Sequence, residues 1–184
     1  MIDEVHVMLD LETWGTAAGS AIRSIGAVVF CPETGKLGNE FYTNVSDESC
    51  LALGMVKDSG TVKFWAEPKN AKANAQLAID PLPIEEAVRR FSQFYITAGG
   101  DFVWSQGGNF DEPLLGYAYR LLGLGAPWKF WASRDTRTAY HYGKRTGRFN
   151  EFAIKRAGTY HNALDDAKHQ AMCVHKATVA IIRG

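Results

Sequence analysis

The first 45 residues place the strongest constraint on the fold, because three successive segments there have the pattern of β-strands. Apolar residues at the odd positions from Val5 to Leu11 alternate with other residues at the even positions, and a period of two is typical of a strand with one buried face. A second segment, Ile22–Phe30, is rich in Ile and Val. After a turn signal in residues 32–35, the chain can return through Phe41–Val45. The sequence therefore predicts a three-stranded antiparallel meander at the front of the chain.

The rest of the chain alternates between helical patterns and short apolar runs. Apolar residues keep helical spacing longest in the final segment, from about Ala163 to Ile182. The other predicted elements are a short helix capped by Thr61, a helix within 80–95, a strand at 102–104, a helix from Asp111 that Gly123 ends, a strand at 130–132 and a helix from about Thr136. We assign Phe64, Trp65 and the Trp128–Trp131 cluster to core packing. This order of elements favours one α/β domain over residues 1–184, with a mixed sheet flanked by helices.

Composition limits the classes of function. The 20 basic residues balance the 20 acidic residues, which excludes a broad electrostatic grip on nucleic acid but not a small site that meets phosphate through metal ions. No apolar run approaches the length of a membrane span, and the acidic start Met1–Glu4 leads directly into a strand. We therefore expect neither a membrane partner nor a signal peptide. Three widely spaced cysteines fit neither a disulfide framework nor a zinc knuckle, which favours a cytoplasmic protein.

Asp10 and Glu12 are the first candidates for chemistry. Residues i and i+2 of a strand project from the same face, so both carboxylates point the same way. Two neighbouring carboxylates repel each other unless a positive charge lies between them, and a hard cation such as Mg²⁺ or Mn²⁺ takes oxygen ligands. An Asp-x-Glu pair on its own is more often the solvent-facing edge of a strand.

Two further segments carry acidic residues at the start of predicted helices. Asp111 follows Phe110 after a glycine-rich turn, and without other evidence it is best interpreted as a helix cap. His161 lies just before the final helix, and Asp166 lies on the first turn of that helix, beside its apolar stripe. Asp165 points almost opposite the stripe, so we expect Asp166 to face a site and Asp165 to face solvent. An acidic first turn favoured by the helix dipole is the alternative.

Together these motifs resemble those of the DEDDh exonucleases of the ribonuclease H-like fold. The resemblance rests on Asp10-Leu11-Glu12-Thr13, then Phe110-Asp111, then His161 with Asp166 five residues later, and it spans the chain. A narrower likeness is to the exodeoxyribonuclease VIII-like branch, which includes phage and prophage proteins and is related to a bacterial 3′→5′ exoribonuclease. The narrower likeness is carried by Leu9–Thr13, Ser24–Phe30, Gly38 with Glu40-Phe41-Tyr42, and Pro127-Trp128 with Phe130-Trp131.

The resemblance implies a ribonuclease H-like fold and a metal-dependent 3′→5′ exonuclease that releases nucleoside 5′-monophosphates, with DNA favoured as the substrate. It implies that Asp10, Glu12, Asp111 and Asp166 hold two divalent ions, Mg²⁺ or Mn²⁺. His161 would be the general base that takes a proton from the attacking water. The expected partner is a nucleic acid 3′ end, either single-stranded DNA or RNA, or duplex DNA, in the cytoplasm of a bacterial or phage-infected cell. A homodimer is compatible with the sequence, which does not fix the oligomeric state.

Five residues are expected to contact the substrate. Thr13 and Trp14 directly follow the acidic strand motif, and the Trp14 ring could stack on the terminal base, although a packing role is equally favoured. Many relatives have Asn a few residues before the Phe-Asp pair, whereas here Gln106 takes that place and Asn109 lies later. Arg137 belongs to a basic stretch that could meet phosphates, although a solvated face is favoured for the stretch as a whole: Arg134, Arg137, Lys144, Arg145 and Arg148.

Three alternatives remain open at this point. The first keeps the fold and the chemistry but acts on RNA 3′ ends, a difference that depends on contact with the 2′-hydroxyl. The second is a catalytically silent nucleic-acid-binding domain, against which the presence of all five catalytic residue types argues. The third is a polymerase proofreading subunit, which the lack of an extension that could tether a polymerase disfavours.

Overall fold

The protein is built on a mixed five-stranded sheet with the strand order β3-β2-β1-β4-β5, as seen in a computed structural model that describes residues 4–183. The strands are β1 (His6–Thr13), β2 (Ile22–Phe30), β3 (Leu37–Asn44), β4 (Phe102–Ser105) and β5 (Ser133–Asp135). β1, β2 and β3 pair antiparallel, whereas β4 and β5 add to the β1 edge as short parallel strands. The predicted meander and mixed α/β sheet are therefore confirmed.

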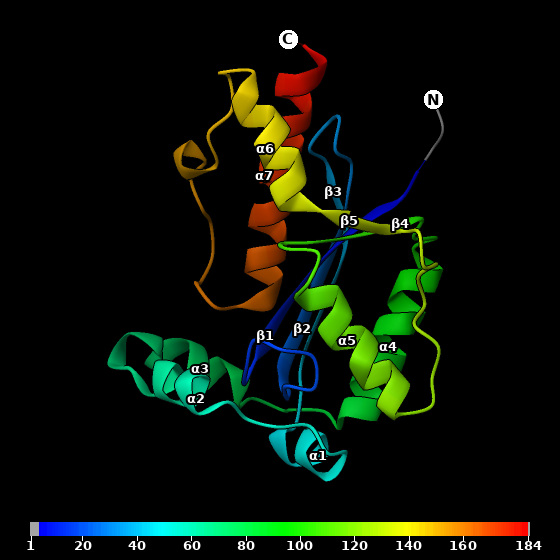
Figure 1. Cartoon of the computed structure of the whole chain (residues 1–184), viewed down its shortest axis with the longest axis vertical. Helices are drawn as coiled ribbons and strands as arrows, with labels where there is room; N and C mark the ends of the chain where they lie inside the picture. Colours follow the sequence, from blue (N-terminus) through cyan, green and yellow to red (C-terminus); the bar gives the residue numbers. More distant parts are fainter. Residues whose placement is uncertain (1–3, 184) are drawn as a thin grey trace.

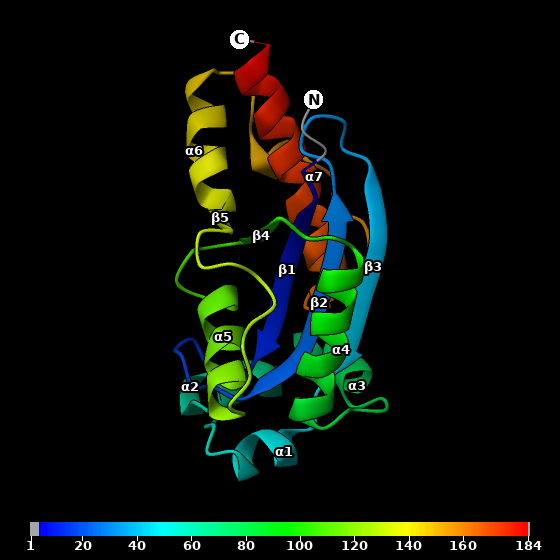
Figure 2. The same cartoon turned by 90° about the vertical axis from the view of Figure 1, so that its right-hand side faces the viewer.

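Helices cover both faces of the sheet (Figures 1 and 2). One face packs against α4 (Ile84–Thr97) and α5 (Asp111–Leu121), and the other packs against α6 (Thr136–Arg145) and α7 (Ala163–Ile182). The alternation in β1 divides its side chains between these layers, because Val7 and Leu9 join the core under α4 and α5 while Met8 joins the core under α6 and α7. The even positions of β1, which include Asp10 and Glu12, therefore belong to the α7 side of the sheet.

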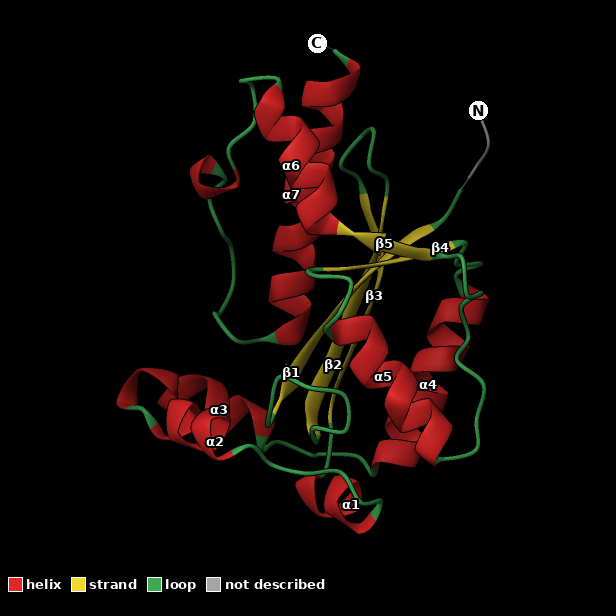
Figure 3. Cartoon of the chain, in the orientation of Figure 1, coloured by secondary structure: helices red, strands yellow, loops and turns green. Residues whose placement is uncertain are grey.

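A small helical insert between β3 and α4 lies at one end of the sheet (Figure 3). It consists of α1 (Asp47–Ala52), α2 (Ser59–Ala66), the 3₁₀ helix η1 (Pro68–Asn70) and α3 (Ala71–Leu77). Trp65, Ala73 and Leu77 form a separate small core that packs against Trp14 and Phe64. The sequence did not predict α1 or α3, because both are short and neither has an extended apolar stripe. A second 3₁₀ helix, η2 (Glu151–Ala153), lies in the connection from α6 to α7.

Four sequence-based expectations need correction. Asp58, not Thr61, caps α2, and its side chain accepts a hydrogen bond from the Thr61 backbone N–H at 2.9 Å. β3 begins at Leu37, four residues before the predicted start. β5 begins at Ser133 rather than at 130, since the preceding residues form the connection to the strand. Phe130 and Trp131 are accordingly 91% and 57% exposed, and of that predicted core cluster Trp128 does pack against the main core.

Among the described residues, no helix combines the length and apolar character that a membrane crossing requires. The acidic start, on which the expectation of no signal peptide rests, lies partly outside the described range, since residues 1–3 are not described.

Candidate active site

Three carboxylates from β1 and α7 converge on the α7 side of the sheet. Asp10 and Glu12 project from β1, and Asp166 projects from the first turn of α7; one ligand oxygen of each lies within 4.8 Å of those of the others. Asn162 fixes the start of α7, because its side chain accepts hydrogen bonds from the backbone N–H groups of the first turn. The structure thus brings three of the four predicted metal ligands together.

Gly26 allows α7 to approach the sheet this closely. It lies on β2 directly opposite Asp10. A Cβ added at Gly26 would collide with the backbone of Ala163 and Leu164, at the start of α7. The position of Asp166 relative to Asp10 therefore depends on direct contact between the backbones of α7 and β2.

Asp111 lies behind this group rather than in it. Its side chain is 1% exposed and accepts a hydrogen bond from the backbone N–H of Leu11 at 3.0 Å. Phe110 occupies the cap position of α5, and Asp111 is the first helical residue, so its interpretation as the helix cap is wrong. Through Leu11, which separates Asp10 from Glu12, Asp111 is tied to the acidic strand motif.

Burial raises the pKa values of Asp10, Glu12 and Asp111, and repulsion between carboxylates adds to the effect for Asp10 and Glu12. Desolvation is the largest cause for Asp10, whose pKa is well above its usual range, and repulsion from Asp111 and Glu12 adds to it. The pKa of Glu12 rises to about 8 through desolvation and then repulsion from Asp111. Desolvation also raises the pKa of Asp111 to about 7. A concentration of carboxylates that resist ionisation in this way is the donor set that a divalent cation stabilises, so the residues fit a metal site.

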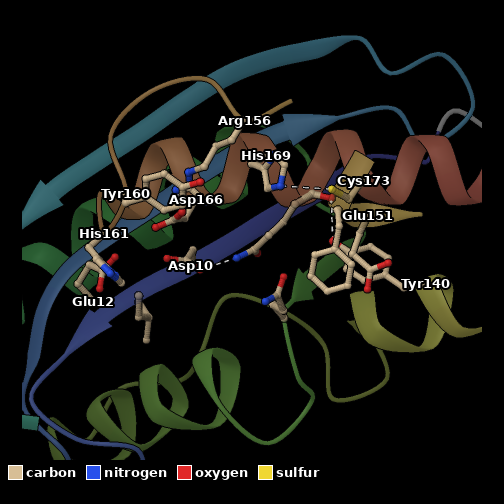
Figure 4. Close-up of a pocket in the computed structure, with 14 residues that line it drawn as sticks. Asp10, Glu12, Tyr140, Glu151, Arg156, Tyr160, His161, Asp166, His169 and Cys173 are labelled. Carbon is tan, nitrogen blue, oxygen red and sulfur yellow. Dashed lines mark hydrogen bonds and ion pairs between the residues drawn. The ribbon is translucent and has the colours of Figure 1, made fainter. Parts of the chain in front are cut away.

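His161 lies beside these carboxylates and lines the same pocket (Figure 4). Its ring makes edge contacts with Phe64 and Trp65, at centroid distances of 5.3 and 5.6 Å. Its backbone has a φ of 60°, the left-handed region, which costs a residue other than glycine on the order of 1–3 kcal/mol and is often found at functional sites. Burial, and then the nearby charges of Arg156 and Lys69, lower the pKa of His161. Its imidazole is therefore neutral at neutral pH, the form that can accept a proton.

The pocket has a volume of about 410 Å³, and its rim carries exposed aromatic rings. Phe152 is 88% exposed and Tyr160 is 67% exposed, and both line the pocket. His169 lines it as well, one turn of α7 after Asp166. Exposed rings beside a cluster of carboxylates suit a substrate that combines flat bases with phosphates.

Sequence reasoning missed several residues of this pocket, and two of them contact the carboxylates directly. Arg156 forms an ion pair with Asp166, and its guanidinium carbon lies 4.4 Å from the centroid of the Tyr160 ring (Figure 4). The Gln170 Nε2 donates a hydrogen bond to Asp10 Oδ1 at 2.6 Å, while the buried Gln170 Oε1 has no hydrogen-bond partner among the described residues. Gln170 could have been found, since it follows Asp166 by four residues and so shares its helix face. Arg156 lies in a loop without a sequence pattern.

Two of the residues expected to contact substrate lie near the pocket, and a third lies in its wall. Gln106 lines the pocket. Asn109 is exposed on the same loop, and Arg137 approaches that loop at Gly107 from the first turn of α6. Arg137 also lines a separate surface hollow with Lys144 and Glu151, which form an ion pair with each other. Elsewhere in the basic stretch, Arg134 covers the Phe102 ring and Arg148 binds the Arg183 carbonyl oxygen.

Thr13 and Trp14 lie outside the pocket lining. The Thr13 hydroxyl donates to the Gly15 carbonyl oxygen at 2.6 Å, and its side chain is buried. The Trp14 indole donates to Asp47 at 2.6 Å, and its ring is approached by the cationic groups of Arg23 and Lys57 at 3.9 and 4.2 Å. These contacts hold Trp14 at the border of the helical insert.

Asp165 does not simply face solvent as expected. Its carboxylate accepts a hydrogen bond from the Thr159 backbone N–H at 2.7 Å. It also packs against Gly158, where a Cβ would collide with the Asp165 carboxyl group. Asp165 therefore holds the loop that leads to His161, because a side chain on α7 can reach back to the segment that precedes the helix.

Comparison with known proteins agrees with this geometry. The model of the 3′-5′ exoribonuclease Rv2179c-like domain matches residues 5–178. No curated protein sequence matches the chain. The nuclease domain of 3′hExo, a DEDDh family member solved bound to rAMP, superposes with a TM-score of 0.64 at 13% identity, covering 94% of this chain and 90% of that one.

Two further solved structures share the fold. E. coli Exonuclease I, in complex with a 5cy-dA13 oligonucleotide, has a TM-score of 0.61 at 13% identity, covering 92% of this chain and 39% of that one. Exonuclease X, in complex with 5′ overhanging duplex DNA, has a TM-score of 0.52 at 16% identity, covering 94% of this chain and 90% of that one. The family match covers nearly the whole chain, and the chain therefore belongs to the Rv2179c-like 3′-5′ exoribonuclease domain family and is a 3′-5′ exonuclease.

Proposed function

We propose that the chain acts as one exonuclease domain that removes nucleoside 5′-monophosphates from single-stranded 3′ ends by a two-metal mechanism. The observation that carries this proposal is the convergence of Asp10, Glu12 and Asp166 beside His161 in one pocket. These three carboxylates would hold the divalent ions, Mg²⁺ or Mn²⁺, with Asp111 behind them. When bound, two such ions neutralise charge on the scissile phosphate and make water more acidic.

The residues of the chain then have separate roles in hydrolysis. The neutral His161 imidazole takes a proton from the attacking water, whose oxygen forms the new bond to phosphorus. The bond from phosphorus to the 3′-oxygen of the preceding nucleotide breaks, and that oxygen takes a proton from solvent, which leaves a new 3′-hydroxyl end and a free 5′-monophosphate. Gln170 keeps Asp10 in position through its 2.6 Å hydrogen bond.

RNA is the first substrate to test. The matched family is described as one of 3′-5′ exoribonucleases, which supports RNA. The motifs that resemble the exodeoxyribonuclease VIII-like branch support DNA, so DNA is the second candidate.

Digestion of matched substrates tests the proposal. Single-stranded RNA, single-stranded DNA and duplex DNA of one sequence, each labelled at the 5′ end, are incubated with Mg²⁺ or Mn²⁺. We expect a ladder that shortens from the 3′ end, strongest on RNA, and no reaction in EDTA or with the Asp10→Ala variant. Cleavage of a covalently closed circle with no attack on free 3′ ends would contradict exonuclease activity. A stronger ladder on DNA would reverse the order of substrates and leave the mechanism in place.

A further inference from the structure

A second cavity opens directly beside the carboxylate pocket. It has a volume of about 450 Å³ and lies between η1 and α3 on one side and the loop before α7 on the other. It shares Tyr160 and His161 with the carboxylate pocket, so these two residues form the boundary between the two cavities. Figures 1 and 3 show α2 and α3 beside the end of α7 from which this loop departs. We call it the lysine cavity, and its lining residues are Lys69, Asn70, Lys72, Ala73, Gly158, Thr159, Tyr160 and His161.

The charge of the lysine cavity is opposite to that of its neighbour. Lys69 and Lys72 line it, and no carboxylate does. The Lys69 ammonium pairs with Glu67 at 2.7 Å, but both side chains are about half exposed or more, so the pair is weak and can exchange for a phosphate. Lys72 forms no ion pair with any described residue. Lys69 and His161 line the same cavity, so the lysine charge lies next to the residue that the two pockets share.

Both walls of the lysine cavity are held by partly buried hydrogen bonds. On the insert side, Asn70 is 2% exposed and donates to the Phe64 carbonyl oxygen at 2.6 Å. On the loop side, Asp165 binds the Thr159 backbone N–H at 2.7 Å. The two lysines and the exposed Tyr160 ring are therefore carried on fixed backbone, which lowers the entropy cost of binding a ligand between them.

We propose that the lysine cavity binds a phosphate of the substrate strand other than the scissile one. The inference rests on the proposed function. In this proposal, a strand with its reactive phosphate at the carboxylates leaves the carboxylate pocket past Tyr160, whose exposed ring can stack on a base. The next backbone phosphate on that side then meets Lys69 and Lys72 rather than Glu12 or Asp166. One pocket thus holds cations for the reaction while the other holds the anionic backbone.

The test compares two substrates that differ in the number of phosphates. One is a single-stranded oligonucleotide, and the other is the p-nitrophenyl ester of thymidine 5′-monophosphate, which has only the phosphate that reacts. We expect the Lys69→Ala/Lys72→Ala double variant to raise KM for the oligonucleotide by roughly 10-fold, so that kcat/KM for the oligonucleotide relative to the ester falls by the same factor. The dependence of log KM on log salt should become shallower by about 1–2 for two lost phosphate contacts.

Two matched variants complete the design. Lys63→Ala removes an exposed lysine of the same insert that lies outside the lysine cavity, and it should keep the wild-type ratio. The Lys69→Arg/Lys72→Arg double variant keeps both charges and should retain most of the oligonucleotide affinity. An unchanged ratio and salt dependence in the alanine variant would overturn the proposal. If the wild-type protein hydrolyses neither substrate, the proposed function fails instead, so the two failures can be told apart.

Discussion

The carboxylate pocket and the lysine cavity are neighbours of similar volume that differ in charge and in burial. The first contains Glu12 at 8% exposure and carboxyl groups whose pKa values are raised, whereas the second is lined by exposed lysines. Buried carboxylates destabilise the protein until a cation joins them, but exposed ammonium groups remain hydrated and cost little. This difference supports the proposed roles, in which the carboxylate pocket holds divalent ions and the lysine cavity binds the substrate strand.

This contrast explains how a chain with no net charge can act on a polyanion. Twenty basic and twenty acidic residues cancel in total, but four carboxylates line one of these pockets and two lysines with no carboxylate line the other. The contrast between the two pockets also predicts different kinetic effects for substitutions in each of them. Changes in the carboxylate pocket should lower kcat, and changes in the lysine cavity should raise KM.

The largest effect is expected for Asp10→Ala, which should abolish metal-dependent turnover because the variant loses the carboxylate at the centre of the acidic group. The same variant loses a negative charge, so its affinity for an oligonucleotide in EDTA should be equal to or higher than that of the wild type. Gel-based turnover and fluorescence anisotropy measure the two quantities. Retained turnover would contradict a catalytic role for the carboxylate pocket. Loss of oligonucleotide binding by a correctly folded variant would contradict the assignment of strand binding to the lysine cavity.

His161→Asn should lower kcat by about 10²–10⁴-fold, the usual contribution of a positioned general base. Asparagine adopts the left-handed backbone more readily than most residues, so the loop at φ 60° should persist. Because burial lowers the pKa of His161, the wild-type rate should stay constant down to below pH 6.5 and fall only as the imidazole becomes protonated. The variant should lack this acid limb. A rise in KM at constant kcat would instead show that His161 serves substrate binding and not proton transfer.

Gln170→Leu should weaken Mn²⁺ affinity or turnover by about 10–100-fold, as is typical when the partner of a metal ligand is removed. The variant loses the hydrogen bond that fixes Asp10 Oδ1 while keeping an apolar side chain of similar size on α7. Isothermal titration with Mn²⁺ and activity at graded Mn²⁺ concentrations provide the measurement. Gln170→Asn is the control, because it keeps the amide group on a shorter side chain and so tests whether the length of the side chain matters. An unchanged Mn²⁺ dependence in Gln170→Leu would show that Gln170 does not position Asp10 for metal binding.

The smallest effect concerns stability. Glu12 and Asp111 have folded pKa values of about 8 and 7, above their ordinary values of 4.5 and 3.8. The folded state therefore binds protons more tightly, and metal-free protein should lose stability as pH rises from about 5 through 8. Saturating Mn²⁺ at pH 8 should raise Tm by several degrees, since a concentration 100 times Kd contributes about 2.7 kcal/mol. Asp10→Asn should reduce the gain. A Tm that rises with pH in EDTA would show that these carboxylates do not meet.

The sequence was most informative where structure follows from local pattern. The period of two in β1 and the long apolar stripe of α7 specified both elements, and with them the face that carries Asp10, Glu12 and Asp166. The DEDDh resemblance then supplied the chemistry that these positions share. Gln170 could have been predicted as a site residue from the same helical spacing.

The rest depended on contacts between distant segments. The lysine cavity exists because η1 and α3 lie against the loop before His161, which no local pattern in residues 68–77 indicates. Arg156 reaches Asp166 from an irregular loop. Apolar composition suggested that Phe130 and Trp131 are buried, but their place in the connection before β5 leaves them exposed.

The contact at Gly26 shows how the spacing of the carboxylates is kept. Two backbones touch there, so the distance from β1 to the start of α7 is set by the thickness of the polypeptide itself and not by the shapes of interchangeable apolar side chains. Apolar side chains deeper in the α7 core can be exchanged for others of similar total volume without altering this spacing. A methyl group added at Gly26 would push α7 away from β2, and so would move Asp166 away from Asp10 on the neighbouring strand.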